Sequence, residues 1–194
     1  VAWCWKAGGA PTATNVASAG AVPTAGSVKI DGANKTDALA GGNPAKKITA
    51  NTKSGFSIVK LTGTGSAATI GHGLSAVPEM IIVKHLNGVN DWWVYNKDLN
   101  GGTNPASYFL KLNTSDAEIL NGSGSVFQGT SPTSSVFYGG TAITDTGREM
   151  IAYCFKSISG FSKIGSYTGN GSAGHAITGL GFQPNYILIK GITS

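Results

Sequence analysis

Two stretches of the chain follow the same residue pattern, and an internal repeat of this kind constrains the architecture before any single residue does. They cover residues 55–84 and 160–190. Both open on Gly-Phe-Ser, continue through Thr-Gly-x-Gly-Ser-Ala and Gly-Leu, and end on a proline, an apolar run and a lysine. A second echo relates the segment AWCWK at 2–6 to AYCFK at 152–156. The chain is therefore expected to cover parts of several β modules arranged in tandem.

The repeat predicts four parts of the chain. Residues 1–9 are expected to be the last strand of an upstream module, and residues 55–159 a complete module. Residues 160–194 would then hold the first strands of the next copy. Between the first two parts, residues 10–54 consist almost entirely of small polar residues, alanine and proline, which is typical of an extended connector. Because the chain has no initiator methionine and opens in a strand-like run, we expect a piece of a longer polypeptide.

Short apolar or alternating runs recur roughly every ten residues, separated by Gly, Asn and Pro. This spacing predicts an all-β fold, an antiparallel β-sandwich or jelly-roll-like module in tandem repeats. The connector contributes at most weak strands at 27–30 and 47–50, and a single helical turn is compatible with 115–120. The main expected strands are 56–61, 80–84, 92–95, 108–113 and 148–156.

Composition limits the classes of partner. Charged residues make up only 12% of the chain, glycine contributes 29 residues, and the net charge of +5 comes from scattered cations. Nucleic-acid binders concentrate lysine and arginine on one face, so no nucleic-acid partner is expected. No apolar run approaches 18 residues, so no membrane partner is expected either. Low charge with many small polar residues is typical of extracellular proteins and of subunits in assembled particles.

The two cysteines, Cys4 and Cys154, occupy matching places in the second echo. Equivalent positions of successive modules are normally far apart, whereas a disulfide needs Cα atoms within about 7 Å. Two buried free thiols are therefore expected in preference to a bridge. This pattern favours folding in a reducing cytoplasm before release.

Residues that carry chemistry are sparse. The glycine-rich turns lack the phosphate-loop pattern, and the three histidines are isolated, so neither a cofactor nor a metal site is expected. Asp116 and Glu118 could pair on one side of a strand, but a glycosidase needs two carboxylates that straddle a sugar site. We therefore assign no catalytic residue and expect a protein that is not an enzyme.

Trp92, Trp93 and Tyr95 form the most informative group of side chains. On a strand, Trp93 and Tyr95 share one face and Trp92 takes the other. One face is expected to enter the core. The other face could present an aromatic ring that stacks on a sugar or anchors an interface, or it could pack against a neighbouring module.

Several strings of the chain resemble a module of large virion-appendage proteins of marine and cyanobacterial tailed phages. They include AWCWKAGG, GFSIV, TIGHGL, MIIVK, PTSSVF and IAYCFKSISGFSKIGSYTGNGS. The similarity covers about 1–9 and 55–190, and in those proteins the module often follows a lectin-like domain. The resemblance implies a structural or adhesive role in a tail fibre, tail spike or capsid-attached fibre, and it carries no catalytic residues.

The leading hypothesis is thus a structural virion-appendage protein that contributes to attachment to the host surface. It would be made in the host cytoplasm and act in the virion, as a homo-oligomer, with a trimer expected, beside other virion proteins. A carbohydrate-binding module that uses Trp92 or Trp93 as a stacking platform is the alternative hypothesis. A spike that depolymerises host polysaccharide is a third.

Overall fold

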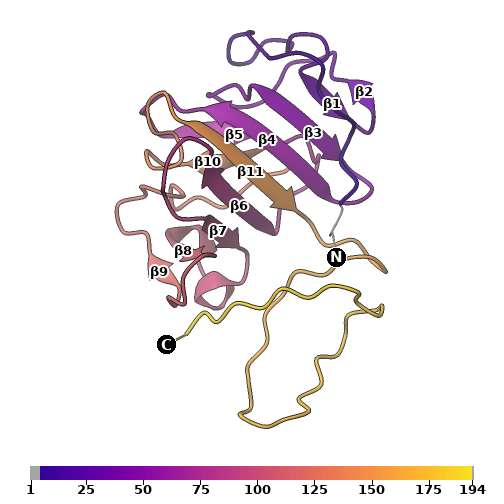
Figure 1. Ribbon diagram of the computed structural model, residues 1–194, viewed down its shortest axis with the longest axis vertical. Helices are drawn as coiled ribbons and strands as arrows, with labels where there is room; N and C mark the ends of the chain where they lie inside the picture. Colours follow the sequence, from indigo (N-terminus) through magenta and orange to yellow (C-terminus); the bar gives the residue numbers. More distant parts are fainter. Residues whose placement is uncertain (1–4, 194) are drawn as a thin grey trace.

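The computed structural model describes residues 5–193. Two β-sheets dominate it, one large and one small (Figure 1). No α-helix occurs in residues 5–193, where the only helical turns are the 3-10 segments η1 (Leu99–Gly102) and η2 (Pro105–Ser107). The described residues include no helix long and apolar enough to cross a bilayer. The all-β prediction is therefore confirmed, whereas the expected tandem modules are not seen.

The large sheet has nine strands in the order β2-β1-β3-β4-β11-β6-β7-β8-β9. All neighbouring pairs are antiparallel except β1 and β3, which run parallel. The bounds of the strands are β1 Val28–Ile30, β2 Ala33–Asn34, β3 Lys47–Asn51, β4 Phe56–Thr62, β6 Met80–His85, β7 Trp93–Asn96, β8 Tyr108–Lys111, β9 Ile119–Leu120 and β11 Glu149–Phe155.

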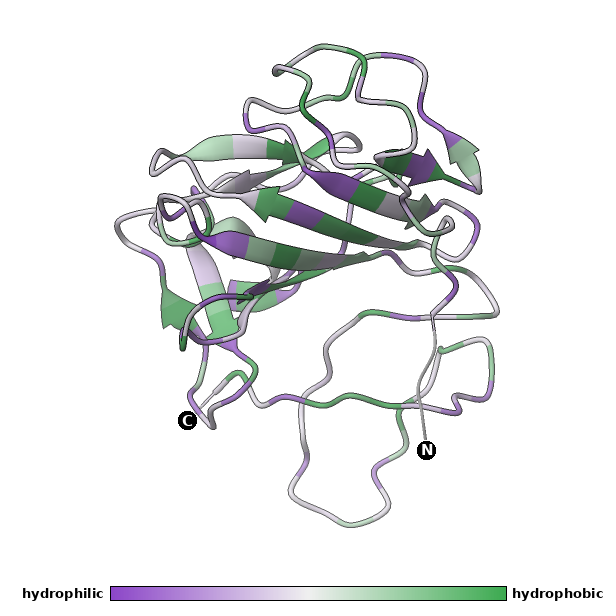
Figure 2. Ribbon diagram, turned by 45° about the horizontal axis from the view of Figure 1, so that its top comes forward, coloured by the Kyte–Doolittle hydropathy of each residue, from purple (hydrophilic) through white to green (hydrophobic). Residues whose placement is uncertain are grey.

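Strand β11 lies at the centre of the large sheet because its residues are apolar on both faces. It pairs with β4 from Glu149 to Phe155 and with β6 from Met150 to Phe155. Met150, Ala152 and Cys154 are buried toward the main core, while Tyr153 and Phe155 pack on the opposite face. Figure 2 shows bands of hydrophobic and hydrophilic colour along strands of the large sheet. The core-facing residues of β11 are fully buried and the residues of its outer face are half-buried, which fits a strand with neighbours on both sides.

The small sheet covers one face of the large sheet. It consists of β5 (Ala68–Gly71) and β10 (Val136–Gly139), which pair antiparallel with Ile70 opposite Phe137. Both side chains are fully buried and belong to the same cluster as Val59, Leu61 and Ile81 of the large sheet. The two sheets therefore share one core, as in a sandwich.

Residues 10–54 are more integrated than the extended connector that the sequence predicts. Strand β3 pairs with β4 over five residues, and β1 extends the sheet beyond β3. Val28, Leu39 and Ile48 are buried in the main core. The segment is short of large apolar residues, and these three are buried against the sheets while Val16 and Val22 stay exposed.

Residues 160–193 differ from the expected start of a second module. Within the described chain after β11, the only β pairing is an isolated bridge between Ile158 and Ser162. Figures 1 and 2 show this segment as a long loop beside the sheets. Strands β4 and β6 of the first copy pair with β3, β11 and β7, whereas within residues 5–193 no strands in these positions flank the matching residues of the second copy.

The structure describes only one of the two cysteines that the sequence predicts to be free thiols. Cys154 is free and fully buried on β11, whereas Cys4 lies outside the described residues. Burial raises the pKa of the Cys154 thiol to about 12, so the reactive thiolate is scarce at neutral pH.

We expect Cys154 to react with a maleimide only when the core opens. In a Cys4→Ser variant, which leaves Cys154 as the one cysteine, labelling of the native protein should be at least about a hundredfold slower than labelling in urea. Mass spectrometry over time measures both rates. Rapid labelling of the native variant would contradict the buried position of β11.

Candidate functional site

The structure separates the three aromatic residues that the sequence singled out. Trp93 and Tyr95 lie on the core face of β7, where they are 9% and 3% exposed. Trp93 makes an edge contact with His85, and Tyr95 makes one with Phe127. Both side chains are therefore out of reach of a glycan or a partner protein. Trp92 lies on the other side and is 37% exposed, so it alone of the three remains available for contact.

Neighbouring strands fix the backbone of Trp92. Its N–H donates to the side-chain oxygen of Asn113 at 2.9 Å, and its carbonyl accepts from the N–H of Leu112 at 2.9 Å. The register of β7 and β8, with Trp93 opposite Lys111, brings these residues together. These two hydrogen bonds fix the backbone that carries the indole, so the ring does not project from a free loop.

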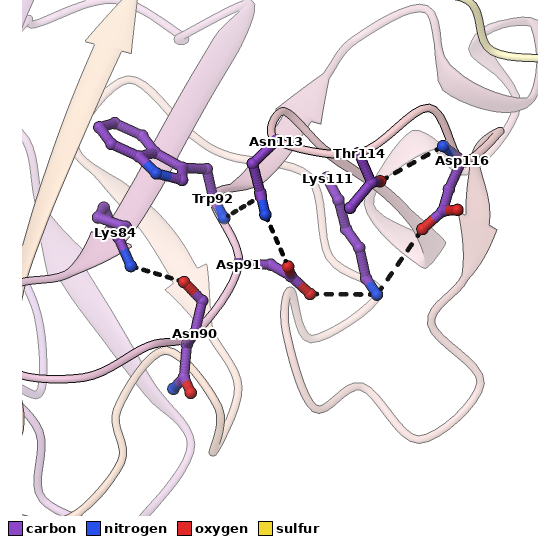
Figure 3. Close-up of polar contacts among 8 residues, drawn as sticks. All are labelled: Lys84, Asn90, Asp91, Trp92, Lys111, Asn113, Thr114 and Asp116. Atoms are coloured by element: carbon purple, nitrogen blue, oxygen red, sulfur yellow. Dashed lines mark hydrogen bonds and ion pairs between the residues drawn. The ribbon is translucent and has the colours of Figure 1, made fainter.

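A chain of polar contacts runs from Asn113 away from the indole (Figure 3). The amide of Asn113 donates to Asp91 at 2.9 Å, and the other carboxylate oxygen of Asp91 lies 3.1 Å from the Lys111 ammonium. Lys111 also lies 3.8 Å from the carboxylate of Asp116. The hydrogen bond from Asn113, together with that from Lys111, lowers the pKa of Asp91 below its usual value. Asp91 is therefore a hydrogen-bond acceptor at neutral pH.

Lys84 completes this surface on the side of β6. It follows Val83, which pairs with Trp93, and Figure 3 shows its side chain beside the indole of Trp92. Its ammonium donates to the carbonyl of Asn90 at 2.6 Å, which holds the loop between β6 and β7. Together, Lys84, Asp91, Trp92, Leu112 and Asn113 form what we name the Trp92 surface.

The Trp92 surface contains a shallow recess of about 180 Å³ lined by Trp92, Leu112 and Asn113. An aromatic face beside an aliphatic side chain can stack on the C–H face of a sugar ring. The amide of Asn113 and the carboxylate of Asp91 can hydrogen-bond to hydroxyl groups around such a ring. An aromatic platform held in place, with a few fixed polar groups beside it, is suited to binding a ligand of this kind.

A second recess, of about 430 Å³, lies at the end of the small sheet. Its walls carry hydroxyl groups, and its one amide, that of Gln128, already donates to the carbonyls of Ala68 and Gly139. Because that amide supports the backbone and Tyr138 is half-buried, the recess presents less to a ligand than the Trp92 surface does. The lining residues are Gly42, Thr64, Ser66, Ala67, Ala68, Thr69, Gln128 and Tyr138.

Groups that bind metals are not gathered in the described residues, where no cluster of three His, Cys, Asp or Glu side chains occurs. His72 and His85 are buried, and each contacts a backbone carbonyl through Nε2. His175 is exposed. The two carboxylates that the sequence paired, Asp116 and Glu118, diverge: Asp116 approaches Lys111, and Glu118 accepts from the N–H of Asn100.

Sequence reasoning missed the polar half of the Trp92 surface. Asp91 and Lys111 are twenty positions apart, and Asn113 is unremarkable in a chain rich in asparagine. Only the pairing of β7 with β8 brings them together. The sole signal along the chain is the aspartate directly before the paired tryptophans.

The two-layer β architecture carries the Trp92 surface at the end of β7, where an exposed aromatic ring lies beside polar side chains. The sequence matches the family described as a domain of unknown function (DUF7483) over residues 28–194, and the chain belongs to this family. The matched span includes β1 to β3 as well as the segment after β11. No curated protein and no solved structure matches the chain.

Proposed function

We propose that this protein is a structural module of a tailed-phage virion appendage and that its Trp92 surface contacts a glycan of the host. The observation that carries the binding part is the exposed indole of Trp92, held between two backbone hydrogen bonds and flanked by Asp91 and Asn113. The appendage part rests on the resemblance in the repeat strings and on the low charge of the chain. The module acts as one subunit of a homo-oligomer.

The geometry favours binding over hydrolysis at this surface. A general acid that works near neutral pH needs a raised pKa, whereas the pKa of Asp91 is lowered. The ammonium of Lys111 lies between Asp91 and Asp116, and its hydrogen bond and positive charge add to the lowering of the pKa of Asp91. These acids are therefore suited to holding a ligand, and the depolymerase hypothesis has less support than a carbohydrate-binding surface.

Replacing Trp92 with alanine should weaken glycan binding at least about tenfold, which corresponds to about 1.4 kcal/mol, because the stacking platform is lost. A glycan array identifies the ligand, and calorimetry with that glycan compares the variant with the parent chain. Tyr167→Ala removes another exposed aromatic ring and is the matched control, with no change expected. Equal affinities for the Trp92→Ala variant and the parent chain would refute this site.

The structural part of the proposal has a separate test. Light scattering of the purified chain should give the mass of an oligomer, with a trimer expected. A monomer at high concentration would contradict the homo-oligomeric appendage without touching the glycan result.

A further inference from the structure

Strand pairing gathers cations that are scattered along the sequence on the outer face of the large sheet, the face that points away from the small sheet. Lys47 on β3 lies directly opposite Lys60 on β4. Lys60 lies opposite Ile151 on β11, and Ile151 lies opposite Lys84 on β6. All four side chains are half-buried and point outward, since the residues next to them on each strand face the core. The pairing therefore forms a row of side chains across these strands.

The row continues to the Trp92 surface. Val83 pairs with Trp93, so the next position of the same antiparallel register sets Lys84 beside Trp92. Figure 3 shows these two side chains next to each other. Neighbouring strands lie about 4.8 Å apart, which gives the row a length of about 19 Å from Lys47 to Trp92. We name it the cationic row, and its members are Lys47, Lys60, Ile151, Lys84 and Trp92.

The cationic row carries more positive than negative charge. Glu149 lies 2.8 Å from the ammonium of Lys60 and offsets that one cation. No ion pair within residues 5–193 includes Lys47 or Lys84, and Lys84 donates to two backbone carbonyls of the loop between β6 and β7. Like charges directly opposite each other destabilise a sheet. An anion bound across Lys47 and Lys60 would relieve their repulsion.

We propose that the cationic row extends the Trp92 surface into a binding site for an acidic polysaccharide. Acidic groups of the glycan lie on the ammonium groups, and one sugar ring stacks on the indole of Trp92. The half-buried Ile151 between Lys60 and Lys84 gives an apolar contact for the sugar in between. This inference rests on the proposed function, because it names the class of glycan that the Trp92 surface binds.

A polysaccharide fits the cationic row better than a nucleic acid does. Sites for single-stranded nucleic acid combine a basic groove with several aromatic rings on which successive bases stack. The cationic row has a single aromatic ring, at one end. Beside that ring, Asp91 and Asn113 offer a carboxylate and an amide that suit the hydroxyl groups of a sugar.

Reversing the charge of Lys47 tests the cationic row. Alginate, a linear polymer of uronic acids, is the probe, and its binding to the full chain is measured by biolayer interferometry at low salt. Lys47→Glu should weaken the binding about three- to fivefold, and added salt should weaken the binding of the parent chain. Lys53→Glu is the matched control, because it makes the same change at an exposed lysine outside the row and should alter the affinity less than about twofold.

The melting temperature shows whether these variants fold. A glutamate at position 47 faces Lys60 across the pair, so Lys47→Glu replaces a repulsion with an attraction and should not lower the melting temperature. An equal loss of binding in Lys47→Glu and Lys53→Glu would mean that net charge, and not the row, attracts the glycan. That result would overturn the proposal, and so would a parent chain that does not bind alginate or that binds single-stranded DNA more tightly.

Trp92→Ala separates this inference from the proposed function. If Trp92→Ala weakens glycan binding and Lys47→Glu does not, the cationic row is wrong and the Trp92 surface stands. If Lys47→Glu weakens alginate binding and Trp92→Ala does not, the lysines act without the indole, and both the Trp92 surface and its extension are wrong. Weaker binding in both variants supports one continuous site.

Discussion

Truncating Phe137 to alanine should lower the free energy of unfolding by about 3 to 5 kcal/mol. Phe137 is the largest fully buried side chain of the small sheet, and it lies opposite Ile70 in the core shared with the large sheet. Its removal opens a cavity between the two layers that the backbone of a two-stranded sheet cannot close. Urea unfolding followed by tryptophan fluorescence measures the change.

Leu120→Ala is the control for this substitution. Leu120 ends β9 and is exposed, so losing its side chain should change the stability by less than about 0.5 kcal/mol. A loss below about 1 kcal/mol for Phe137→Ala would mean that the small sheet does not pack on the large one. The sandwich arrangement would then be wrong even if every strand were correct.

Strands with apolar residues on both faces could be predicted from the sequence. The alternation over 148–156 and the β-branched run over 80–84 correspond to β11 (Glu149–Phe155) and β6 (Met80–His85). The pattern worked there because burial on both faces leaves few other places for such segments. The run at 115–120, compatible with a helical turn, instead contributes β9 at Ile119–Leu120.

Pairing partners could not be predicted, because they depend on contacts far apart in the chain. The parallel pairing of β1 with β3 joins two segments of weak apolar content, and β10 reaches back to β5 across more than sixty residues. The second repeat also shows that strand formation depends on distant partners. Residues 160–190 carry the local pattern of β4 and β6, yet no strand forms where the flanking partners are missing from the described residues.

The candidate site was likewise predictable only where strand geometry alone decides. Alternation correctly predicted that Trp92 and Trp93 lie on opposite faces, since that follows from strand geometry alone. Which of them is exposed depends on the tertiary packing, which places Trp93 in the main core beside His85. The clustering of Asp91, Lys111 and Asn113 depends on the register of β7 against β8.

The buried imidazole of His72 should make the protein less stable in mild acid. His72 is fully buried; its Nε2 lies 3.1 Å from the carbonyl of Thr133, and its Nδ1 accepts from the N–H of Leu74 at 3.2 Å. This arrangement fits the neutral ring with its proton on Nε2. Burial lowers the pKa of His72 from 6.5 to about 4, against a smaller opposing effect of the Thr133 carbonyl.

The sign of the effect follows from linkage between protonation and folding. Above pH 6.5 neither the folded nor the unfolded chain protonates His72, so the pH has no effect through this group. Between pH 6.5 and 4 the unfolded chain binds a proton that the folded chain excludes, and the stability falls as the pH falls. Below pH 4 both states bind the proton and the slope vanishes.

The expected loss through His72 is about 2 kcal/mol at pH 5 and about 3 kcal/mol at pH 4, relative to neutral pH. Urea unfolding at each pH measures it, and the difference between the parent chain and His72→Asn removes the contribution of the carboxylates. Asparagine keeps an acceptor for the N–H of Leu74 but cannot titrate, so this variant should start less stable and lose less in acid. His175→Asn, at an exposed position, should keep the slope of the parent chain. If His72→Asn kept that slope as well, the acid sensitivity would have to arise from another group, and the imidazole of His72 would not be held neutral in the core.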